Sequence, residues 1–394
     1  MELRQGYKQT EVGVIPEDWE AVTFRQVVEN NRLPSGIYKD KNLYGSGNKI
    51  IKLGDVFGYD YFLPDLAQRV ELSKEEIKNY RVELGDIFIA LASVKLEGVG
   101  KVMLVTELDE DTSWDHNVAL MRLIQGIDQK YIFYLFKSQI VRKLITSRAT
   151  QVGTTFLKTS TILEFPIALP PKQYEQRAIA SVLSDVDALI AKLDQLITKK
   201  RDLKQAAMQQ LLTGQTRLPG FSGEWKIKRL GDLLKVRHGK SQQNVIATGG
   251  IYPILATGGE IGRTNTYLYD KPSVLIGRKG TIDRPQYQDS PFWTVDTLFY
   301  TELSCASHPK FVYFKFLMID WRSYNEASGV PSLNASTIEN IEISIPKYSE
   351  QAAIATILLD MDTEITALEI RRDKTRYLKQ GMMQELLTGK IRLP

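Results

Sequence analysis

EQRAIASVLSDVDALIAKLDQLITKKRDLKQAAMQQLLTGQTRLP occupies residues 175–219, and it returns as EQAAIATILLDMDTEITALEIRRDKTRYLKQGMMQELLTGKIRLP at residues 350–394. The two copies align without a gap at an offset of 175, and 24 of their 45 positions are identical. Self-similarity of this kind marks a duplicated architecture. The remainder of the two halves is much less alike, so the duplication has kept these segments while the regions between them have diverged.

Each copy is predicted to be one long helix. Pro171 and Pro346 precede the copies, where proline suits the first turn, and Gly214 and Gly389 follow, where a helix usually ends. The roughly 40 residues between these signals correspond to a helix of about 60 Å at 1.5 Å per residue.

The apolar residues of both helices follow a heptad seam, in which spacings of three and four alternate. The first copy places Leu183, Val186, Ile190, Leu193 and Ile197 on this seam, and the second places Leu358, Met361, Ile365 and Leu368 there. We expect the seam to resume at Leu203, Met208, Leu211 and Leu212 in the first copy and at Leu378, Met383, Leu386 and Leu387 in the second. A stripe this long needs a partner, and the other copy is the most direct one.

The predicted fold class is therefore α+β, with two mixed α/β domains joined by two long antiparallel helices that form a coiled-coil rod with pseudo-two-fold symmetry. The alternative is that each helix packs only on its own domain. The predicted boundaries are a first domain with a short N-terminal segment at 1–170, a central helix at 171–214, a second domain at 215–345 and a C-terminal helix at 346–394.

Short β-like runs separated by turn residues fill both predicted domains. Each domain also ends in an aromatic helical stretch, YIFYLFKS from Tyr131 and FVYFKFLM from Phe311. Because these aromatic residues are nearly continuous, we expect core helices rather than exposed stacking platforms. Trp114 and Trp293 are likewise expected in the core.

Composition excludes several classes of protein. The single cysteine, Cys305, rules out a disulfide framework and a cysteine-rich zinc site, and the three histidines form no i, i+4 pair. The N-terminal residues lack an apolar signal region and no run of about 18 apolar residues occurs, so we expect a cytoplasmic protein. The net charge of +4 favours polyanionic partners only slightly.

Catalytic motifs are missing from the sequence. Residues 239–241 read GKS, but position 234 is leucine, so the phosphate-binding loop pattern fails. The only Pro-Pro pair, at 170–171, follows Leu169 and lacks the Asn or Asp and the aromatic residue of amino-methyltransferases. We therefore expect no catalytic residues, no metal and no cofactor in this chain.

Several loops carry residues suited to phosphate or base-edge contacts, namely cationic, hydroxyl and amide side chains next to glycine. Two loop pairs occupy matching repeat positions, those at Ser35 and Lys240 and those at Gly153 and Gly329. The candidate DNA-binding residues of the first domain are Arg32, Ser35, Tyr38, Lys39, Ser93, Lys95, Gln151, Thr154 and Thr155. Those of the second domain are Arg237, Lys240, Ser241, Gln242, Arg278, Lys279, Thr281, Ser328 and Ser332.

On these features the chain resembles the specificity subunit of type I restriction-modification systems. The matching stretches are YKQTEVGVIPEDWE at 7–20, GFSGEW at 220–225, the two LLTG-x-x-RLP tails and the two EQ-x-AIA helix openings. The resemblance covers essentially the whole chain. It implies two target recognition domains that each read one half of a split double-stranded DNA site, with helices that set the unread spacer.

The resemblance also implies partners. Two modification (methyltransferase) subunits would dock on the helices and a restriction (motor-nuclease) subunit would join for cleavage, while S-adenosylmethionine and ATP would be bound by those partners. Three alternatives stay open: a self-sufficient enzyme, a protein-interaction scaffold, and the recognition subunit of a methylation-only complex. Salt-dependent DNA binding would separate the scaffold from the other readings.

Overall fold

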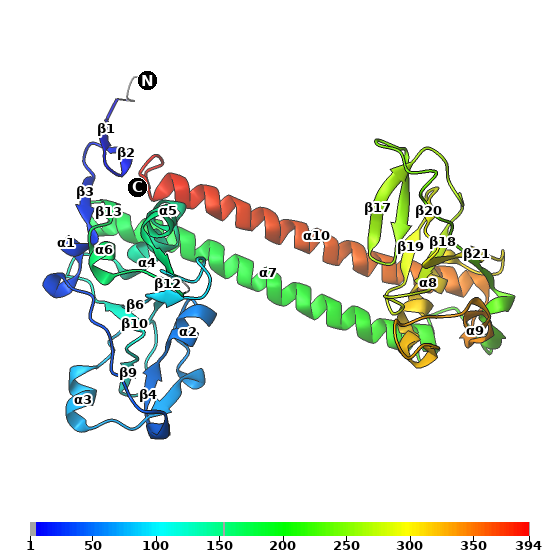
Figure 1. Ribbon diagram of the computed structural model, residues 1–394, viewed down its shortest axis with the longest axis horizontal. Coiled ribbons are helices and arrows are strands. Elements are labelled where there is room, and N and C mark those ends of the chain that lie inside the picture. The colour runs from blue at the N-terminus through cyan, green and yellow to red at the C-terminus, as the bar shows by residue number, and fades with distance from the viewer. Residues whose placement is uncertain (1–4, 153, 394) are drawn as a thin grey trace. The chain divides into compact units, whose positions relative to one another are not determined.

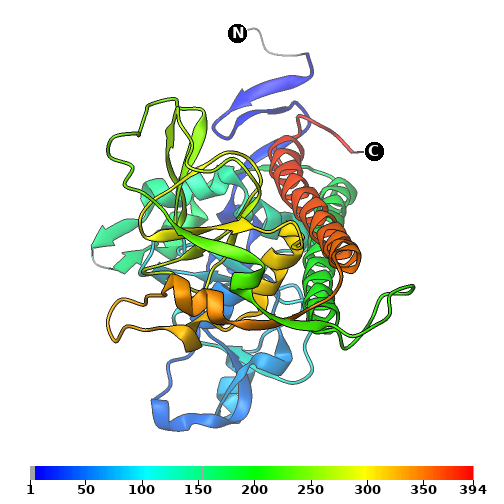
Figure 2. The ribbon, with the colours of Figure 1, turned by 90° about the vertical axis from the view of Figure 1, so that its right-hand side faces the viewer.

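The chain folds into two compact units, shown as ribbons in Figures 1 and 2. Unit 1 comprises Met1–Lys192 with Arg371–Pro394, and unit 2 comprises Leu193–Ile370. The computed structural model describes residues 5–152 and 154–393. The two long helices, α7 (Gln173–Thr213) and α10 (Tyr348–Leu386), each contribute one end to unit 1 and the other end to unit 2.

The predicted fold class is confirmed, since mixed helix and sheet domains accompany two long helices. Besides α7 and α10, the α-helices are α1 (Phe24–Val27), α2 (Leu53–Gly58), α3 (Lys74–Asn79), α4 (Gln129–Lys137), α5 (Gln139–Arg148), α6 (Thr159–Leu163), α8 (Pro309–Met318) and α9 (Ala335–Asn340). Short 3₁₀ turns are η1 (Glu29–Asn31), η2 (Lys41–Leu43), η3 (Pro64–Leu66), η4 (Leu230–Asp232) and η5 (Trp321–Tyr324). None of the helices in the described residues combines the length and apolar character that a bilayer span requires.

Within the part of unit 1 that the structure describes, the strands form five small sheets: β10-β6-β8, β5-β4-β9, β11-β12-β7, β13-β3 and β1-β2. Their bounds are β1 (Tyr7–Thr10), β2 (Gly13–Pro16), β3 (Glu20–Thr23), β4 (Tyr44–Ile51), β5 (Gln68–Val70), β6 (Ile87–Ala90), β7 (Ala92–Ser93), β8 (Val102–Leu104), β9 (Thr112–Trp114), β10 (Val118–Met121), β11 (Thr150–Val152), β12 (Thr154–Phe156) and β13 (Pro166–Leu169).

Unit 2 repeats the plan around the sheet β15-β21-β18-β19, with β17-β16-β20 and β14-β22 beside it. The bounds are β14 (Lys226–Arg229), β15 (Leu234–His238), β16 (Tyr252–Ala256), β17 (Gly259–Thr264), β18 (Ser273–Gly277), β19 (Gln286–Gln288), β20 (Trp293–Thr294), β21 (Leu298–Leu303) and β22 (Glu342–Ile345). In each unit one strand pair is parallel, β4 with β9 in unit 1 and β16 with β20 in unit 2, while the pairs of the sheets β10-β6-β8 and β15-β21-β18-β19 are antiparallel. The two domains therefore share one topology despite their divergent sequences.

Each unit closes its core with the start of one long helix and the end of the other. In unit 1, Leu183 of α7 is buried in one cluster with Leu386 and Leu387 from the end of the second repeat. In unit 2, Leu358 of α10 is buried with Leu212 from the end of the first repeat. The aromatic helices α4 and α8 lie in these same clusters, as predicted. The repeated LLTG tails therefore act as core elements of both domains.

The two long helices lie side by side and antiparallel within unit 2 (Figures 1 and 2). Lys200 pairs with Glu364 at 2.6 Å and Lys204 pairs with Asp362 at 2.5 Å, so that residue numbers rise on one helix as they fall on the other. The predicted seam residues of both repeats are buried or half-buried: Leu183, Leu193, Ile197, Leu358 and Ile365 are buried, and Val186, Ile190, Met361 and Leu368 are half-buried.

The seam resumes as expected at Leu211 and Leu212 of the first copy and at Met383, Leu386 and Leu387 of the second, which are buried, while Met208 is half-buried. The expectation is wrong only at Leu203 and Leu378. Their side chains are 48% and 60% exposed, respectively. The next residue of each repeat, Lys204 or Lys379, turns toward the partner helix instead and pairs with an aspartate there. A helix with 3.6 residues per turn drifts against a strict heptad, which moves the contact to the adjacent position.

The C-terminal end of each repeat binds the first turn of the other long helix, a contact that we call the clamp. In unit 1 the guanidinium of Arg392 pairs with the buried carboxylate of Glu175 and with Asp18, at 2.9 Å to each. In unit 2 the guanidinium of Arg217 forms two hydrogen bonds with the buried carboxylate of Glu350, at 2.6 and 2.7 Å. The arginine of each RLP tail thus neutralises the glutamate that opens the other copy of the helix.

The glutamine that follows each glutamate has a second structural role. The Oε1 atom of Gln176 accepts a hydrogen bond from the backbone N–H of Asp128, the residue that caps α4, at 2.8 Å. Gln351 accepts from the backbone N–H of His308, which caps α8, at 2.9 Å. The first turn of each long helix therefore fixes the start of the aromatic core helix in its own unit, which positions the domain on the helix.

Candidate nucleic-acid interface

Two of the predicted loops of unit 2 leave the same edge of its four-stranded sheet. β15 and β18 lie on either side of β21 and both run antiparallel to it, so the two strands end at one edge. Beyond these ends, the N–H of Lys240 donates to the carbonyl of Thr294 at 2.9 Å, and the N–H of Arg278 donates to the carbonyl of Thr297 at 2.8 Å. The two loops therefore bracket one short segment, residues 294–297.

The third predicted loop of unit 2 joins the same edge. Lys279 and Ser332 form an antiparallel bridge, and the N–H of Gly280 donates to the carbonyl of Pro331 at 2.9 Å. The loop 328–332 is thereby tied to the end of β18. All three stretches that were selected from the sequence of this domain meet at one edge of the sheet.

Unit 1 builds a matching edge. Ser35 forms an antiparallel bridge with Ala119 of β10, and the N–H of Ile37 donates to the carbonyl of Trp114 at 2.9 Å. This contact corresponds to the one between Lys240 and Thr294 in unit 2.

The other two loops of unit 1 meet through β7 and β12. Ser93 pairs with Thr155, and the N–H of Leu157 donates to the carbonyl of Leu91 at 2.9 Å. In unit 2 the N–H of Leu333 makes the corresponding 2.9 Å bond with the carbonyl of Arg278. The predicted loops of both domains therefore converge in the same way at equivalent sheet edges.

A glycine is required where the first loop of each domain crosses this edge. A Cβ atom at Gly36 would lie 2.0 Å from the carbonyl oxygen of Trp114, and one at Gly239 would lie 2.0 Å from the carbonyl oxygen of Val295. Real Cβ atoms do not approach a backbone oxygen so closely, so any other residue would displace the loop. This close approach brings the loops Ser35–Lys39 and Lys240–Gln242 against the sheet edge.

Most of the candidate residues present their side chains to solvent. The exposed ones are Arg32, Ser35, Tyr38, Lys95 and Thr154 in unit 1 and Arg237, Lys240, Ser241, Lys279 and Ser328 in unit 2. The half-buried ones are Lys39, Ser93, Gln242, Arg278, Thr281 and Ser332.

Two candidates differ from this pattern. The side chain of Thr155 is fully buried, because β12 turns it toward the sheet interior, and it does not face a ligand. The side chain of Gln151 and the glycine at 153 lie outside the described residues. Thr155 and Gln151 are therefore not part of the proposed interface.

The cationic candidates divide into two groups. Lys39 pairs with Glu76 at 2.7 Å, which lowers the pKa of that carboxyl to about 2, and Arg237 pairs with Glu302 at 2.9 Å. The side chains of Arg32, Lys95, Lys240, Arg278 and Lys279, in contrast, form no ion pair within the described residues, although Arg278 donates to the backbone carbonyl of Asp296 at 3.3 Å. This second group has its charge available for an anion such as a phosphate.

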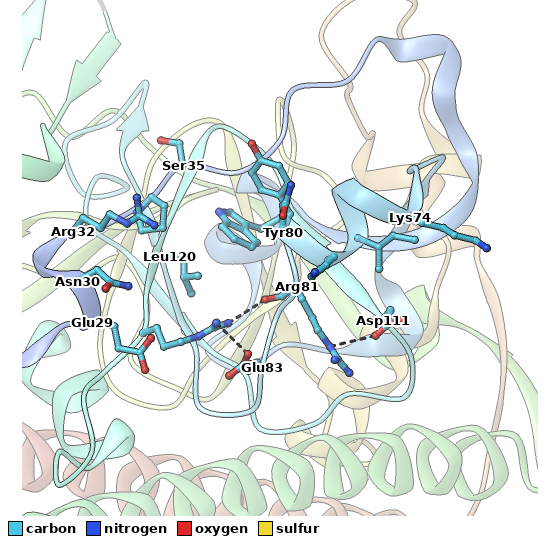
Figure 3. A pocket seen from close by; sticks show the side chains of 16 residues that line it. Glu29, Asn30, Arg32, Ser35, Lys74, Tyr80, Arg81, Glu83, Asp111 and Leu120 are labelled. Atoms are coloured by element: carbon cyan, nitrogen blue, oxygen red, sulfur yellow. Dashed lines mark hydrogen bonds and ion pairs between the residues drawn. The ribbon is translucent and has the colours of Figure 1, made fainter.

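A cavity adjoins the interface of unit 1, and it was not predicted from the sequence. It has a volume of about 680 Å³ and is lined by Arg32 and Ser35 together with residues outside the predicted loops, among them Lys78, Tyr80 and Arg81 (Figure 3). The stretch KEEIKNYR at 74–81 carried a signal, since Lys74 and Lys78 stand one helical turn apart beside an aromatic residue and an arginine.

Comparison with known proteins identifies this doubled arrangement of domain and long helix. The sequence model of the type I restriction modification DNA specificity domain matches twice, at residues 16–199 and 222–374. A putative type I restriction enzyme specificity subunit (MjaX) of Methanocaldococcus jannaschii is 26% identical over 419 residues, covering 99% of this chain and 97% of the relative.

Solved structures agree on the fold. The S subunit of a type I restriction-modification system from M. genitalium superimposes with a TM-score of 0.62 at 17% identity, covering 98% of both chains. A chain from a study of complex assembly and conformational transition of the type I R-M system gives a TM-score of 0.59 at 14% identity, covering 96% of this chain and 99% of that one. These likenesses establish a shared fold.

The fold is thus that of a two-domain specificity subunit. The chain belongs to the family of type I restriction-modification DNA specificity domains and carries that domain twice. The resemblance seen in the sequence is confirmed.

Proposed function

We propose that the chain is the non-catalytic recognition subunit of a type I restriction-modification complex and that its two domains, at 1–170 and 215–345, each read one half of a bipartite double-stranded DNA site. The observation that carries the proposal is the convergence of three loops at equivalent sheet edges in both units. Such loops offer unpaired cations for phosphates and hydroxyl and amide groups for base edges. Because their side chains differ between the units, the two half-sites are expected to differ.

The long helices are proposed to set the unread spacer and to dock two modification subunits, with a restriction subunit joining for cleavage. The support for a spacer function is the clamp at both helix ends, because it ties each domain to a fixed turn of the helix pair. Half-site spacing then follows from helix length, as it does for other paired DNA readers. The chemistry of S-adenosylmethionine and ATP would belong to the partners.

The first experiment is co-expression with modification subunits followed by genome-wide sequencing of methylated bases. We expect a split motif of two short halves around a fixed gap. Lys95→Ala in unit 1 and Lys279→Ala in unit 2 should weaken DNA binding and each reduce the salt slope by about one phosphate contact. A continuous motif, or methylation that persists when this chain is deleted, would overturn the proposal.

A second experiment tests the spacer. A matched insertion of one heptad into both α7 and α10 should lengthen the unread gap while both half-sites stay the same. The control is the same insertion in α7 alone, which should destabilise the chain because it shifts Lys204 away from Asp362. An unchanged gap after the matched insertion would show that the helices do not measure the site.

A further inference from the structure

The cavity beside the unit 1 interface combines aromatic groups with free positive charge. Tyr80 and Trp114 line it and contact each other edge to face, with ring centroids 5.4 Å apart. In Figure 3, Arg32, Ser35 and Tyr80 lie around its upper part, and Arg81 and Glu83 lie below them. The cavity volume of about 680 Å³ lies within the usual range for small-molecule binding sites, so the cavity is large enough for one nucleotide unit.

The charges of the wall leave a positive excess. The lining carries five cationic side chains (Arg32, Lys74, Lys78, Arg81 and Arg122) and three carboxylates (Glu29, Glu83 and Asp111). Arg81 is held by Asp111 at 3.5 Å, and Arg122 is shared between Asp86 at 2.6 Å and Glu83 at 3.2 Å. Arg32 and Lys78 form no ion pair within the described residues. An anionic group is therefore the ligand that this wall favours, and a guanidinium with an ammonium group suits a phosphate.

One buried donor in the wall lacks an acceptor. Trp114 is 3% exposed, and its indole Nε1 has no hydrogen-bond partner within the described residues. An unsatisfied buried donor costs about 1–3 kcal/mol, so it marks a place where an acceptor is favourable. The nitrogen is itself buried, so a base or sugar in the cavity reaches it only when the surrounding side chains move aside.

The turn that carries Arg32 to the cavity is unusual. Asn30 and Asn31 have φ values of 53° and 52°, the left-handed region that non-glycine residues rarely adopt in succession. Asn30 itself lines the cavity. Backbone conformations of this kind are concentrated at binding sites, where the local strain fixes a side chain.

Unit 2 does not repeat this chemistry. The equivalent backbone contacts place Thr294 where unit 1 has Trp114, and Tyr300 and Glu302 where it has Leu120 and Arg122. Glu302 pairs with Arg237 across the sheet at 2.9 Å. The aromatic and cationic cavity is thus a property of the first domain.

We propose that this cavity binds one nucleotide unit, with its phosphate held by Arg32 and Lys78 and its base placed against the half-buried ring of Tyr80, which packs on Trp114. The unit could be a nucleotide of the DNA strand that leaves the stack beside the half-site, or a free nucleotide. The first source rests on the proposed function, because Arg32 and Ser35 belong to both the cavity and the DNA interface. The second source does not depend on it.

The test follows the indole N–H resonance of Trp114 in the full-length ¹⁵N-labelled chain, assigned with Trp114→Phe. Deoxyadenosine monophosphate, thymidine monophosphate and inorganic phosphate are titrated separately, followed by a duplex that contains the recognised site. We expect the nucleotides and the duplex to shift this resonance, and Arg32→Ala with Lys78→Ala to weaken the nucleotide response at least tenfold. The matched control, Lys41→Ala, removes an exposed lysine outside the cavity wall and should change nothing.

The outcomes separate the sources. A shift with the duplex assigns the site to a nucleotide of DNA, and a shift with mononucleotides alone assigns it to a free nucleotide. A shift with inorganic phosphate that nucleotides do not exceed indicates an adventitious anion only and overturns the proposal, as does no shift with any ligand. If the chain fails to bind the duplex at all, the proposed function fails, while the mononucleotide titration still decides whether the site exists.

Discussion

The two halves of the chain agree closely at the ends of the long helices and much less closely at the edges of the sheets. At the helix ends the repeats keep the same side chains in the same contacts, as with Arg392 on Glu175 and Arg217 on Glu350. At the sheet edges the backbone contacts agree while the side chains do not. A side chain whose partner lies within the protein is fixed by that partner, whereas one that faces a ligand is free to follow the ligand.

The largest expected effect is a loss of folding stability when a buried leucine at the end of either repeat is removed. Leu387→Ala in unit 1 and Leu212→Ala in unit 2 each remove a side chain that is at most 1% exposed, and each should lower the free energy of unfolding by about 2–5 kcal/mol. Guanidinium denaturation followed by circular dichroism measures the loss. Leu203→Ala, on the exposed face of α7, is the control and should cost far less. A cost at Leu203 equal to that at Leu212 would contradict the assignment of these leucines to the cores.

The next largest effect is expected at the two glycines where the first loop of each domain crosses its sheet edge. Gly36→Ala and Gly239→Ala place a Cβ atom 2.0 Å from a carbonyl oxygen, and each should destabilise its domain by about 1–3 kcal/mol and weaken DNA binding through a displaced loop. Gly54→Ala in unit 1 and Gly258→Ala in unit 2 are matched controls, since no atom lies within 4 Å of the added Cβ. Wild-type DNA affinity in both variants would remove the loops from the interface.

A smaller effect distinguishes the two lysine–aspartate pairs that join the long helices. Asp187 accepts hydrogen bonds from Lys379 at 2.6 Å and from the hydroxyl of Tyr134 at 3.0 Å, while Asp362 pairs with Lys204 in unit 2. In unit 2 the ring beside that lysine belongs to a phenylalanine, which has no hydroxyl. Asp187→Ala should therefore cost about 1 kcal/mol more than Asp362→Ala, the usual worth of one further hydrogen bond.

A double-mutant cycle isolates that difference. In the Tyr134→Phe background, Asp187→Ala and Asp362→Ala should cost the same within error, as measured by urea denaturation. If the excess cost at Asp187 persists without the hydroxyl, its origin is not the Tyr134 hydrogen bond.

The smallest effect is a pH dependence at the unit 1 edge. The ammonium group of Lys39, together with the backbone N–H and hydroxyl of Ser73, lowers the pKa of Glu76 from its ordinary 4.5 to about 2. A carboxyl whose folded-state pKa is depressed contributes stability that is present above pH 4.5 and lost as the pH falls from about 4.5 to about 2. Lys39→Ala should raise the pKa of Glu76 toward 4.5 in an NMR titration, while Lys41→Ala should leave it depressed. An unchanged pKa in Lys39→Ala would show that another group holds the carboxylate.

The helices were predictable because their information is local and periodic. Proline before each repeat, glycine after it and the spacing of Leu183 to Ile197 describe a helix without reference to the rest of the chain. The equivalence of the loops at Ser35 and Lys240 was also readable, since it follows from position in the repeat. The exposed Leu203 was not, because small angular drift along a helix decides which residue meets its neighbour.

By itself, the sequence determined the duplication, the two long helices, the family and the set of loops that carry polar side chains. Only the tertiary structure decided that Arg392 meets Glu175, 217 residues away, that Thr155 turns inward, and that Lys78, Tyr80 and Trp114 share a cavity with Arg32. The reason is physical: periodicity and turn chemistry act between neighbours in the chain. Ion pairs and cavities, in contrast, are made by residues that come together only when sheets and helices pack.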